Sequence, residues 1–131
     1  MTRYNKIKVY LSGGMRTNWQ GKVMQSCGDK FVFFNPYEHN IDKSIEYTQW
    51  DIFHVKESDI LFAYIEKSNP SGIGLALEIG YAKALSKLII LVDEKSGQYD
   101  DFRKYFNIVR DSASVVFDNL DDGIKYLKKY H

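Results

Sequence analysis

Several features that mark secreted and membrane proteins are scarce or missing in this chain. Cys27 is the single cysteine, so no disulfide can form within one chain, and the start, MTRYNKIKVY, lacks the apolar stretch of a signal peptide. The longest apolar runs, such as the one at 88–92, are far shorter than the roughly 20 residues that a membrane-spanning helix needs. These absences predict a cytoplasmic protein that does not enter a membrane.

An excess of charge of either sign is also missing. The chain has 18 basic and 17 acidic residues, so its net charge is +1. Such a surface provides no strong field to attract nucleic-acid phosphates or anionic lipids, and we expect neither as a partner. The three histidines and Cys27 show no metal-ligand spacing, so we predict no bound metal, and no motif indicates a cofactor.

Proline is scarce as well, and both prolines follow apolar runs, where a loop is expected. The sequence has no repeat, low-complexity tract or linker, and 131 residues suit one core, so we predict one domain over 1–131.

The predicted strands are rich in β-branched and aromatic residues and cover 7–11, 31–34, 60–65, 88–92 and 114–117. Segments of helical length and period lie between them, at 17–28, 42–57, 72–86, 99–106 and 120–130.

Strands and helices alternate along the whole chain. Parallel strands need crossover connections, and nearly continuous apolar strands indicate a sheet that is covered on both faces. We therefore predict an α/β fold: a doubly wound, flavodoxin-like or Rossmann-like domain with a five-stranded parallel sheet and helices on both faces. Ligands of such folds bind at the carboxyl ends of the strands, so functional residues are expected in segments 12–16, 35–36 and 68–74.

Glu78 is an isolated carboxylate in the apolar helical stretch SGIGLALEIGYAKAL. Burying an ion there costs several kcal/mol unless it has hydrogen bonds, a helix N-terminus or a chemical role. Because the helix begins near the ligand edge, its dipole is expected to keep Glu78 ionised and nucleophilic. The alternative is a structural glutamate that is satisfied by a neighbouring tyrosine or backbone group. We favour a catalytic role, since isolated acids in such surroundings often have one.

A second carboxylate, Asp51, lies in the helical segment YTQWDIFHVKESD, where apolar and polar residues alternate. On pattern alone, an ordinary exposed helix residue explains Asp51 equally well. As a pair, Asp51 and Glu78 could flank one sugar carbon. One carboxylate would attack the anomeric carbon and the other would protonate the leaving group, as in retaining glycosidases, whose carboxyl groups lie about 5 Å apart.

The segment YLSGGMR places Gly13 and Gly14 after a strand, where backbone amides can approach a phosphate or a sugar. A plain turn has the same pattern. Arg16 follows closely and suits either a bidentate contact with a phosphate or an ordinary surface salt bridge.

A second glycine-containing segment, NPSGIG, lies near the start of the helix that carries the isolated carboxylate. Ser71, Gly72 and Gly74 are expected to present free backbone amides there, together with the serine hydroxyl. This arrangement fits an anion cradle, and it fits a simple helix cap as well.

Three stretches form a combined pattern: KVYLSGGMR, the segment from Asp51 to Asp59 that leads into ILFAYI, and GLALEIGYAKALSKLIILV. Together they resemble the nucleoside 2-deoxyribosyltransferase superfamily over residues 7–92, most specifically in the E-[IL]-G-Y-A core that begins at Glu78. The resemblance implies that Glu78 forms a covalent glycosyl-enzyme and that Asp51 handles the proton on the departing base. Tyr10 matches the tyrosine that orients the nucleophile in this family.

The resemblance also implies the substrate and the assembly. Nucleosides or nucleotides would be the small-molecule substrates, in nucleotide metabolism such as purine or pyrimidine salvage. Family members form homodimers or larger homo-oligomers whose neighbours help to complete the site, and segment 107–114 is expected to reach across.

One position departs from the transferase pattern. Many transferases carry an aspartate six residues before the nucleophile, where this chain has Gly72. In contrast, Gly13, Gly14, Arg16 and Ser71 are similar to the branch that hydrolyses nucleoside 5′-monophosphates, in which a serine and the glycine-rich loop hold the phosphate. Three functions stay open: 2-deoxyribosyl transfer between bases, which we favour; hydrolysis of a nucleoside 5′-monophosphate; and a non-catalytic nucleotide-binding module.

Overall fold

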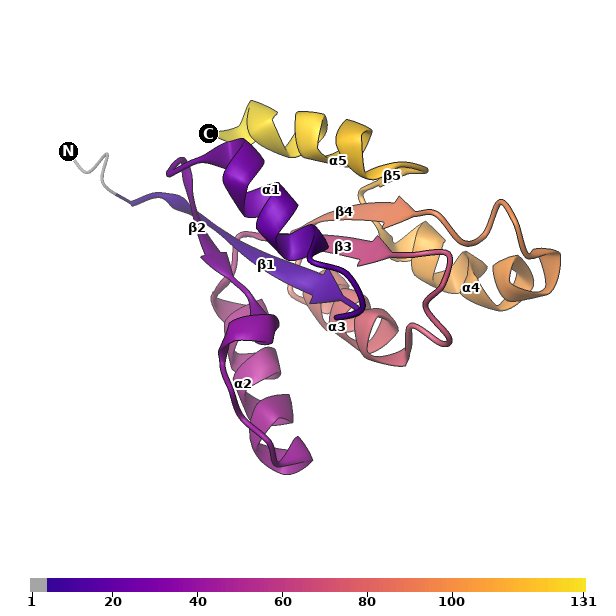
Figure 1. The fold of residues 1–131 in the computed structure, drawn as a ribbon, viewed down its shortest axis with the longest axis horizontal. Helices are drawn as coiled ribbons and strands as arrows, with labels where there is room; N and C mark the ends of the chain where they lie inside the picture. The colour runs from indigo at the N-terminus through magenta and orange to yellow at the C-terminus, as the bar shows by residue number, and fades with distance from the viewer. Residues whose placement is uncertain (1–4) are drawn as a thin grey trace.

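A five-stranded parallel sheet with the strand order β2-β1-β3-β4-β5 forms the centre of the computed structural model (Figure 1). The structure describes residues 5–131, so the first four residues of the start examined for a signal peptide lie outside it. The strands are β1 (Ile7–Gly13), β2 (Phe31–Phe34), β3 (Ile60–Ile65), β4 (Leu88–Asp93) and β5 (Val115–Phe117). All six residues of β3 are buried because this strand lies in the middle of the sheet.

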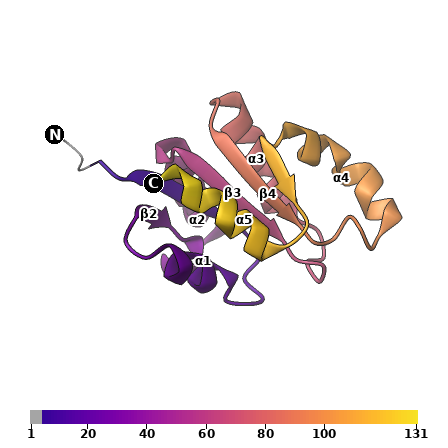
Figure 2. The same ribbon diagram turned by 90° about the horizontal axis from the view of Figure 1, so that it is seen from above.

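Helices cover both faces of the sheet, as Figures 1 and 2 show. They are α1 (Trp19–Cys27), η1 (Pro36–Glu38, a 3-10 turn), α2 (Ser44–Glu57), α3 (Ile73–Ala84), α4 (Asp100–Ser112), α5 (Leu120–Leu127) and η2 (Lys128–Tyr130, also 3-10). α1 and α5 pack on one face, and α2, α3 and α4 pack on the other, which gives two apolar cores. The predicted doubly wound α/β fold is therefore confirmed.

Several predicted boundaries differ from the structure by one or more residues, and two of these differences have a clear physical cause. β1 continues two residues beyond the predicted end at Leu11, because Ser12 and Gly13 pair with Ala63 and Tyr64 of β3. The fourth helix runs to Ser112 rather than to 106. Its extension continues an apolar stripe, Phe102, Phe106 and Val109, whose spacing places all three on the core side of α4.

The strand order creates a switch point between β1 and β3. From β1 the chain passes through α1 to β2 on one side, and from β3 it passes through α3 to β4 on the other. The loops that leave the two central strands therefore diverge onto opposite faces, and their carboxyl ends border the place where ligands of such folds bind. The residues that the sequence predicted for the site lie at or close to this edge.

α2 is covered over only a small part of its surface. Val55 is its only buried residue, and the helix extends away from the sheet in Figure 1. Within residues 5–131, no helix is both long and apolar enough to cross a membrane.

Candidate active site

Glu78 is held against β1 by α3. The helix packs its apolar face, including Leu75 and Ile79, on the sheet, and Glu78 shares that side, so it is only 9% exposed. The Tyr10 hydroxyl donates a hydrogen bond to Glu78 Oε2 (2.9 Å), and the Ser12 hydroxyl donates one to Oε1 (2.6 Å). Tyr10 and Ser12 are two residues apart on one strand and therefore point to the same face.

The environment makes Glu78 a weak acid. Burial raises the pKa of Glu78 to about 7; the hydrogen bonds from Ser12 and Tyr10 oppose this rise, and the charge of Asp51 adds to it. Burial outweighs the two hydrogen bonds, so Glu78 is only partly ionised near neutral pH. Glu78 lies in the second turn of α3, and the effect of the dipole fades beyond the first turn.

Asp51 reaches the same region from α2. Its side chain is 21% exposed, and its Oδ1 atom is buried and has no hydrogen-bond partner within residues 5–131. Burial raises the pKa of Asp51, and this rise is opposed by His39, by the Tyr10 hydroxyl and by His54. Asp51 is therefore not the ordinary exposed helix residue that its sequence pattern equally allowed.

Tyr10 lies between the two carboxyl groups. It is fully buried, and burial together with the charges of Glu78 and Asp51 raises the pKa of the Tyr10 phenol above its ordinary value. The phenol therefore keeps its proton and acts as a hydrogen-bond donor. Tyr10, Ser12, Glu78 and Asp51 form one buried polar group at the switch point of the sheet.

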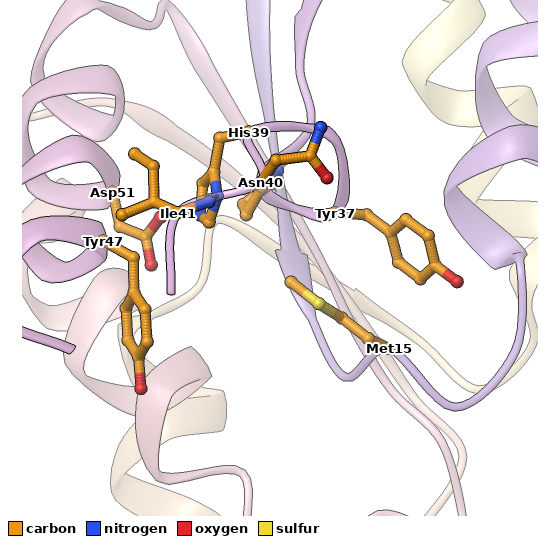
Figure 3. Close-up of a pocket in the computed structure, with 8 residues that line it drawn as sticks. Met15, Tyr37, His39, Asn40, Ile41, Tyr47 and Asp51 are labelled. Atoms are coloured by element: carbon orange, nitrogen blue, oxygen red, sulfur yellow. Dashed lines mark hydrogen bonds and ion pairs between the residues drawn. The ribbon is translucent and has the colours of Figure 1, made fainter. Parts of the chain in front are cut away.

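A pocket of about 440 Å³ opens beside Asp51 (Figure 3). Its volume lies in the range of small-molecule sites, and aromatic rings form much of its wall. The His39 and Tyr47 rings are nearly parallel, with centroids 6.3 Å apart. Glu78 does not line this pocket, so Asp51 is the acid that faces it. The lining residues are Met15, Pro36, Tyr37, His39, Asn40, Ile41, Tyr47 and Asp51.

The glycine-rich segment after β1 passes close over the neighbouring strand. Gly13 has φ +153°, and a Cβ atom at this position would lie 2.4 Å from the Tyr64 carbonyl oxygen, so a larger residue does not fit. The Gly14 carbonyl accepts hydrogen bonds from the side chains of Trp19 and Gln20. Arg16 is exposed and forms no ion pair within residues 5–131.

The backbone amides of segment 69–74 are less available than the sequence suggested. Asn69 Oδ1 accepts hydrogen bonds from the amides of Ser71 (3.1 Å) and Gly72 (3.0 Å), and the Ile73 amide donates to Ser71 Oγ (3.4 Å). These contacts are made within the loop and at the first residue of α3. An anion could use these amides only by displacing the contacts.

Gly72 occupies a position that disfavours the aspartate found in many transferases. It has φ +71°, which favours glycine, and a Cβ atom there would lie 2.6 Å from Ile65 Cδ1. The departure from the transferase pattern is therefore built into the packing of the loop on β3. Gly74, by contrast, is exposed, with open space around the position of a Cβ atom.

Several residues of this region do not stand out in the sequence. Ser12 lies in the segment 12–16 where functional residues were expected, but its contact with Glu78 was not predicted, although Ser12 follows Tyr10 with strand period. His39, Tyr37 and Tyr47 come together only through the path of the chain between β2 and α2. Glu66 follows β3 and is also buried: the Thr17 hydroxyl donates to its Oε1 (2.9 Å), while its Oε2 has no partner within residues 5–131.

Residues 5–131 contain no group of three or more histidine, cysteine, aspartate or glutamate side chains arranged to hold a metal ion. At the switch point, the structure brings together two carboxyl groups and the hydroxyls beside them. These features define a doubly wound α/β protein with a paired-carboxylate site at the edge of its sheet.

The chain belongs to the family described as nucleoside 2-deoxyribosyltransferase like, whose sequence profile matches residues 6–96. This result confirms the resemblance seen in the sequence motifs. A comparison with curated proteins finds no match.

Solved structures share the fold at low sequence identity. A conserved protein from Enterococcus faecalis V583 is 16% identical, with a TM-score of 0.72 over 97% of this chain and 100% of the other. The 2-desoxiribosyltransferase from Leishmania mexicana is 15% identical, with a TM-score of 0.67 over 95% and 99%. The CMP N-glycosidase BcmB from Clostridium botulinum is 20% identical, with a TM-score of 0.59 over 94% and 99%.

The raised pKa of Glu78 makes the stability of the protein depend on pH. A buried neutral Glu78 stabilises the fold fully below the ordinary glutamate pKa of about 4.3, and this contribution is lost as the pH rises through about 7. Glu78→Gln does not titrate. The free energy of unfolding of this variant, relative to wild type, should increase by about 2–3 kcal/mol between about pH 5 and about pH 8.

Urea unfolding of both proteins at the two pH values measures this difference. Glu57→Gln, which changes an exposed carboxylate at the end of α2, is the matched control and should follow the wild type at both pH values. Equal pH dependence of Glu78→Gln and wild type would contradict the burial of an ionisable Glu78.

Proposed function

We propose that the protein cleaves the N-glycosidic bond of a (deoxy)nucleoside through a covalent glycosyl-Glu78 intermediate and transfers the 2-deoxyribosyl group to another base. The observation that carries this proposal is the buried Glu78 carboxyl group, which receives hydrogen bonds from Tyr10 and Ser12 and senses the charge of Asp51. The family supports this choice of chemistry. We further propose that residues 1–131 form one domain of this kind.

In the first step, a Glu78 oxygen attacks C1′ of the sugar while the bond from C1′ to the base nitrogen breaks. The electron pair of that bond goes to the base, and Asp51 supplies the proton that makes the base a better leaving group. With a pKa of about 7, Glu78 is about half ionised at neutral pH, and its ionised form is more basic than an ordinary carboxylate. The Tyr10 and Ser12 hydroxyls fix the orientation of the carboxylate.

In the second step, a nitrogen of another base attacks C1′ and Glu78 departs as a carboxylate. Asp51 takes up the proton that the incoming base loses, so the site returns to its starting state. The pocket beside Asp51 is where the proposal places the base, because its aromatic wall suits a planar ring. Both steps need a substrate whose sugar lies between this pocket and Glu78.

Hydrolysis of a nucleoside 5′-monophosphate is the second candidate. It is supported by Arg16, which is exposed beside the glycine-rich segment, by Ser71, and by the shared fold of the CMP N-glycosidase. Glu66 favours the unphosphorylated substrate instead. A Cβ atom on Gly14 would lie 3.7 Å from the unpartnered Glu66 Oε2, so a buried carboxylate group stands beside the segment that a phosphate would approach.

We also propose that the protein is a homodimer or a larger homo-oligomer. Four large apolar side chains on α3 and α4 are more than half exposed: Ile73, Leu77, Tyr105 and Ile108. Ile73, Leu77 and Ile108 border an apolar groove between these two helices. Monomeric proteins seldom leave such surfaces uncovered, and α4 contains most of the segment expected to reach a neighbouring subunit.

Product analysis separates the candidate functions. Incubation with deoxynucleosides and deoxynucleotides, with and without a second free base, should give base exchange, which chromatography resolves. Base release that does not depend on an added base would indicate hydrolysis, and absence of both reactions would support a non-catalytic nucleotide-binding module. Glu78→Ala should abolish turnover, because the variant lacks the carboxylate that would form the proposed glycosyl intermediate; persistent turnover would remove the nucleophile assignment.

Arg16→Ala tests whether a phosphate is recognised. For a 5′-monophosphate substrate, KM should rise by about tenfold or more, since a hydrogen bond to a charged group is worth roughly 1.5–3 kcal/mol. The unphosphorylated nucleoside is the internal control, and its KM should stay the same in the variant. An unchanged KM for both substrates would count against the monophosphate reading.

Disruption of the exposed apolar surface tests the assembly. Wild type should have at least twice the mass of the chain in light scattering coupled to gel filtration, and Leu77→Glu and Ile108→Glu should shift it toward the monomer. Lys129→Gln has the same change in charge in the 3-10 turn after α5, which packs on the opposite face of the sheet, and should leave the mass unchanged. A monomeric wild type would refute the proposal.

A further inference from the structure

His39 follows η1 and forms part of the pocket wall next to Asp51, as Figure 3 shows. Its side chain is only 11% exposed. The ring is held by its neighbours: it is stacked with Tyr47 and meets the Trp50 ring edge-to-face, with centroids 4.9 Å apart. His39 therefore has a defined orientation and does not behave as a mobile surface histidine.

A backbone contact determines which ring nitrogen carries the proton. The Ile41 amide donates a hydrogen bond to His39 Nδ1 at 3.0 Å. A nitrogen that accepts a hydrogen bond has no proton of its own, so the proton of the neutral ring is on Nε2. A second proton on the ring would break the contact with Ile41. His39 is thus a fixed Nε2–H donor.

That donor is directed at Asp51. Nε2 lies 3.7 Å from Asp51 Oδ1, the buried oxygen that has no hydrogen-bond partner in the described part of the chain. The distance is longer than a hydrogen bond, and a small movement of either side chain closes it. Contacts of this kind in catalytic sites are often long without substrate and shorten when substrate binds.

We propose that His39 is a positioning residue for Asp51: its Nε2–H group orients the carboxyl group and stabilises the carboxylate that remains when the proton has passed to the departing base. The inference rests on the proposed N-glycosidic cleavage. The Ile41 contact leaves Nε2 as the ring nitrogen that can donate to Asp51. A neutral donor suits this task, since it stabilises the anion without competing with the base for the proton.

Other groups also act on Asp51, and the test must separate them from His39. Tyr10 faces it from β1, His54 lies one turn further along α2, and Glu78 on α3 senses its charge. A pH profile of activity alone reports on the whole group. The test therefore needs variants that remove either the Nδ1 acceptor or the Nε2–H donor of His39, one at a time.

His39→Asn and His39→Gln form such a pair. The asparagine oxygen takes the place of Nδ1 and keeps the acceptor for the Ile41 amide, but its side chain ends short of Asp51. The glutamine amide places an N–H donor near the position of Nε2. We expect kcat to fall by about tenfold or more in His39→Asn, with little change in KM, and to recover in His39→Gln to within about threefold of wild type. An equal loss in both variants, or no loss in either, would overturn the proposal.

NMR spectroscopy gives a readout that needs no substrate. In wild type, the ring nitrogen signals of His39 should show the Nε2–H tautomer near neutral pH. In protein labelled with 13C in its aspartate carboxyl groups, the pKa of Asp51 should be higher in His39→Asn than in wild type, because a donor to the carboxylate is lost, and should return in His39→Gln. An Nδ1–H tautomer, or the same Asp51 pKa in all three proteins, overturns the positioning role. Absence of turnover in wild type would instead refute the proposed function while these measurements still decide the role of His39.

Discussion

The site depends on one constraint: the Glu78 carboxyl group is kept out of water beside the central strands. α3 can bury this acid because its other inward residues, such as Leu75 and Ile79, pack firmly on the sheet. Two hydroxyl groups on β1 replace the water molecules that a carboxylate would otherwise bind. These hydrogen bonds do not fully compensate the lost hydration, so the pKa of Glu78 is raised. Ionisation of Glu78 therefore lowers the free energy of unfolding. Conflict of this kind between stability and chemistry is common in functional sites.

Much of the fold could be predicted because buried parallel strands have a direct signature in sequence. ILFAYI and LIILV are continuous apolar runs, and each became a central strand with the predicted start. The ends of elements were harder to predict. Ser12 and Gly13 joined β1 because β3 offers hydrogen-bond partners beyond the apolar run, and α4 extended because Val109 continues its contact with the core. Both outcomes depend on tertiary contacts that local sequence does not contain.

The site was predictable to the extent that its chemistry is local. Glu78 was recognisable as a lone acid among apolar neighbours, and the structure brings it together with Tyr10 and the charge of Asp51. His39 was not recognisable, because its proposed role depends on two contacts, with Ile41 and Asp51, and both follow from the path of the loop between β2 and α2. The amides near Ser71 appeared free in the sequence because nothing local shows that Asn69 already bonds them.

The Tyr10 hydroxyl links the two carboxyl groups of the site. A phenol has a single proton to share, and here that proton is directed at Glu78 Oε2, although Asp51 is the second charge that acts on the same hydroxyl. The two acids therefore act on one phenol proton. Whichever acid receives it is favoured as the anion, and the partner is released to react or to hold a proton. Glu78 and Asp51, which come from different helices, are thus coupled through one hydroxyl of β1, and a change in the charge of either acid acts on the hydrogen bond that holds the other site member in place.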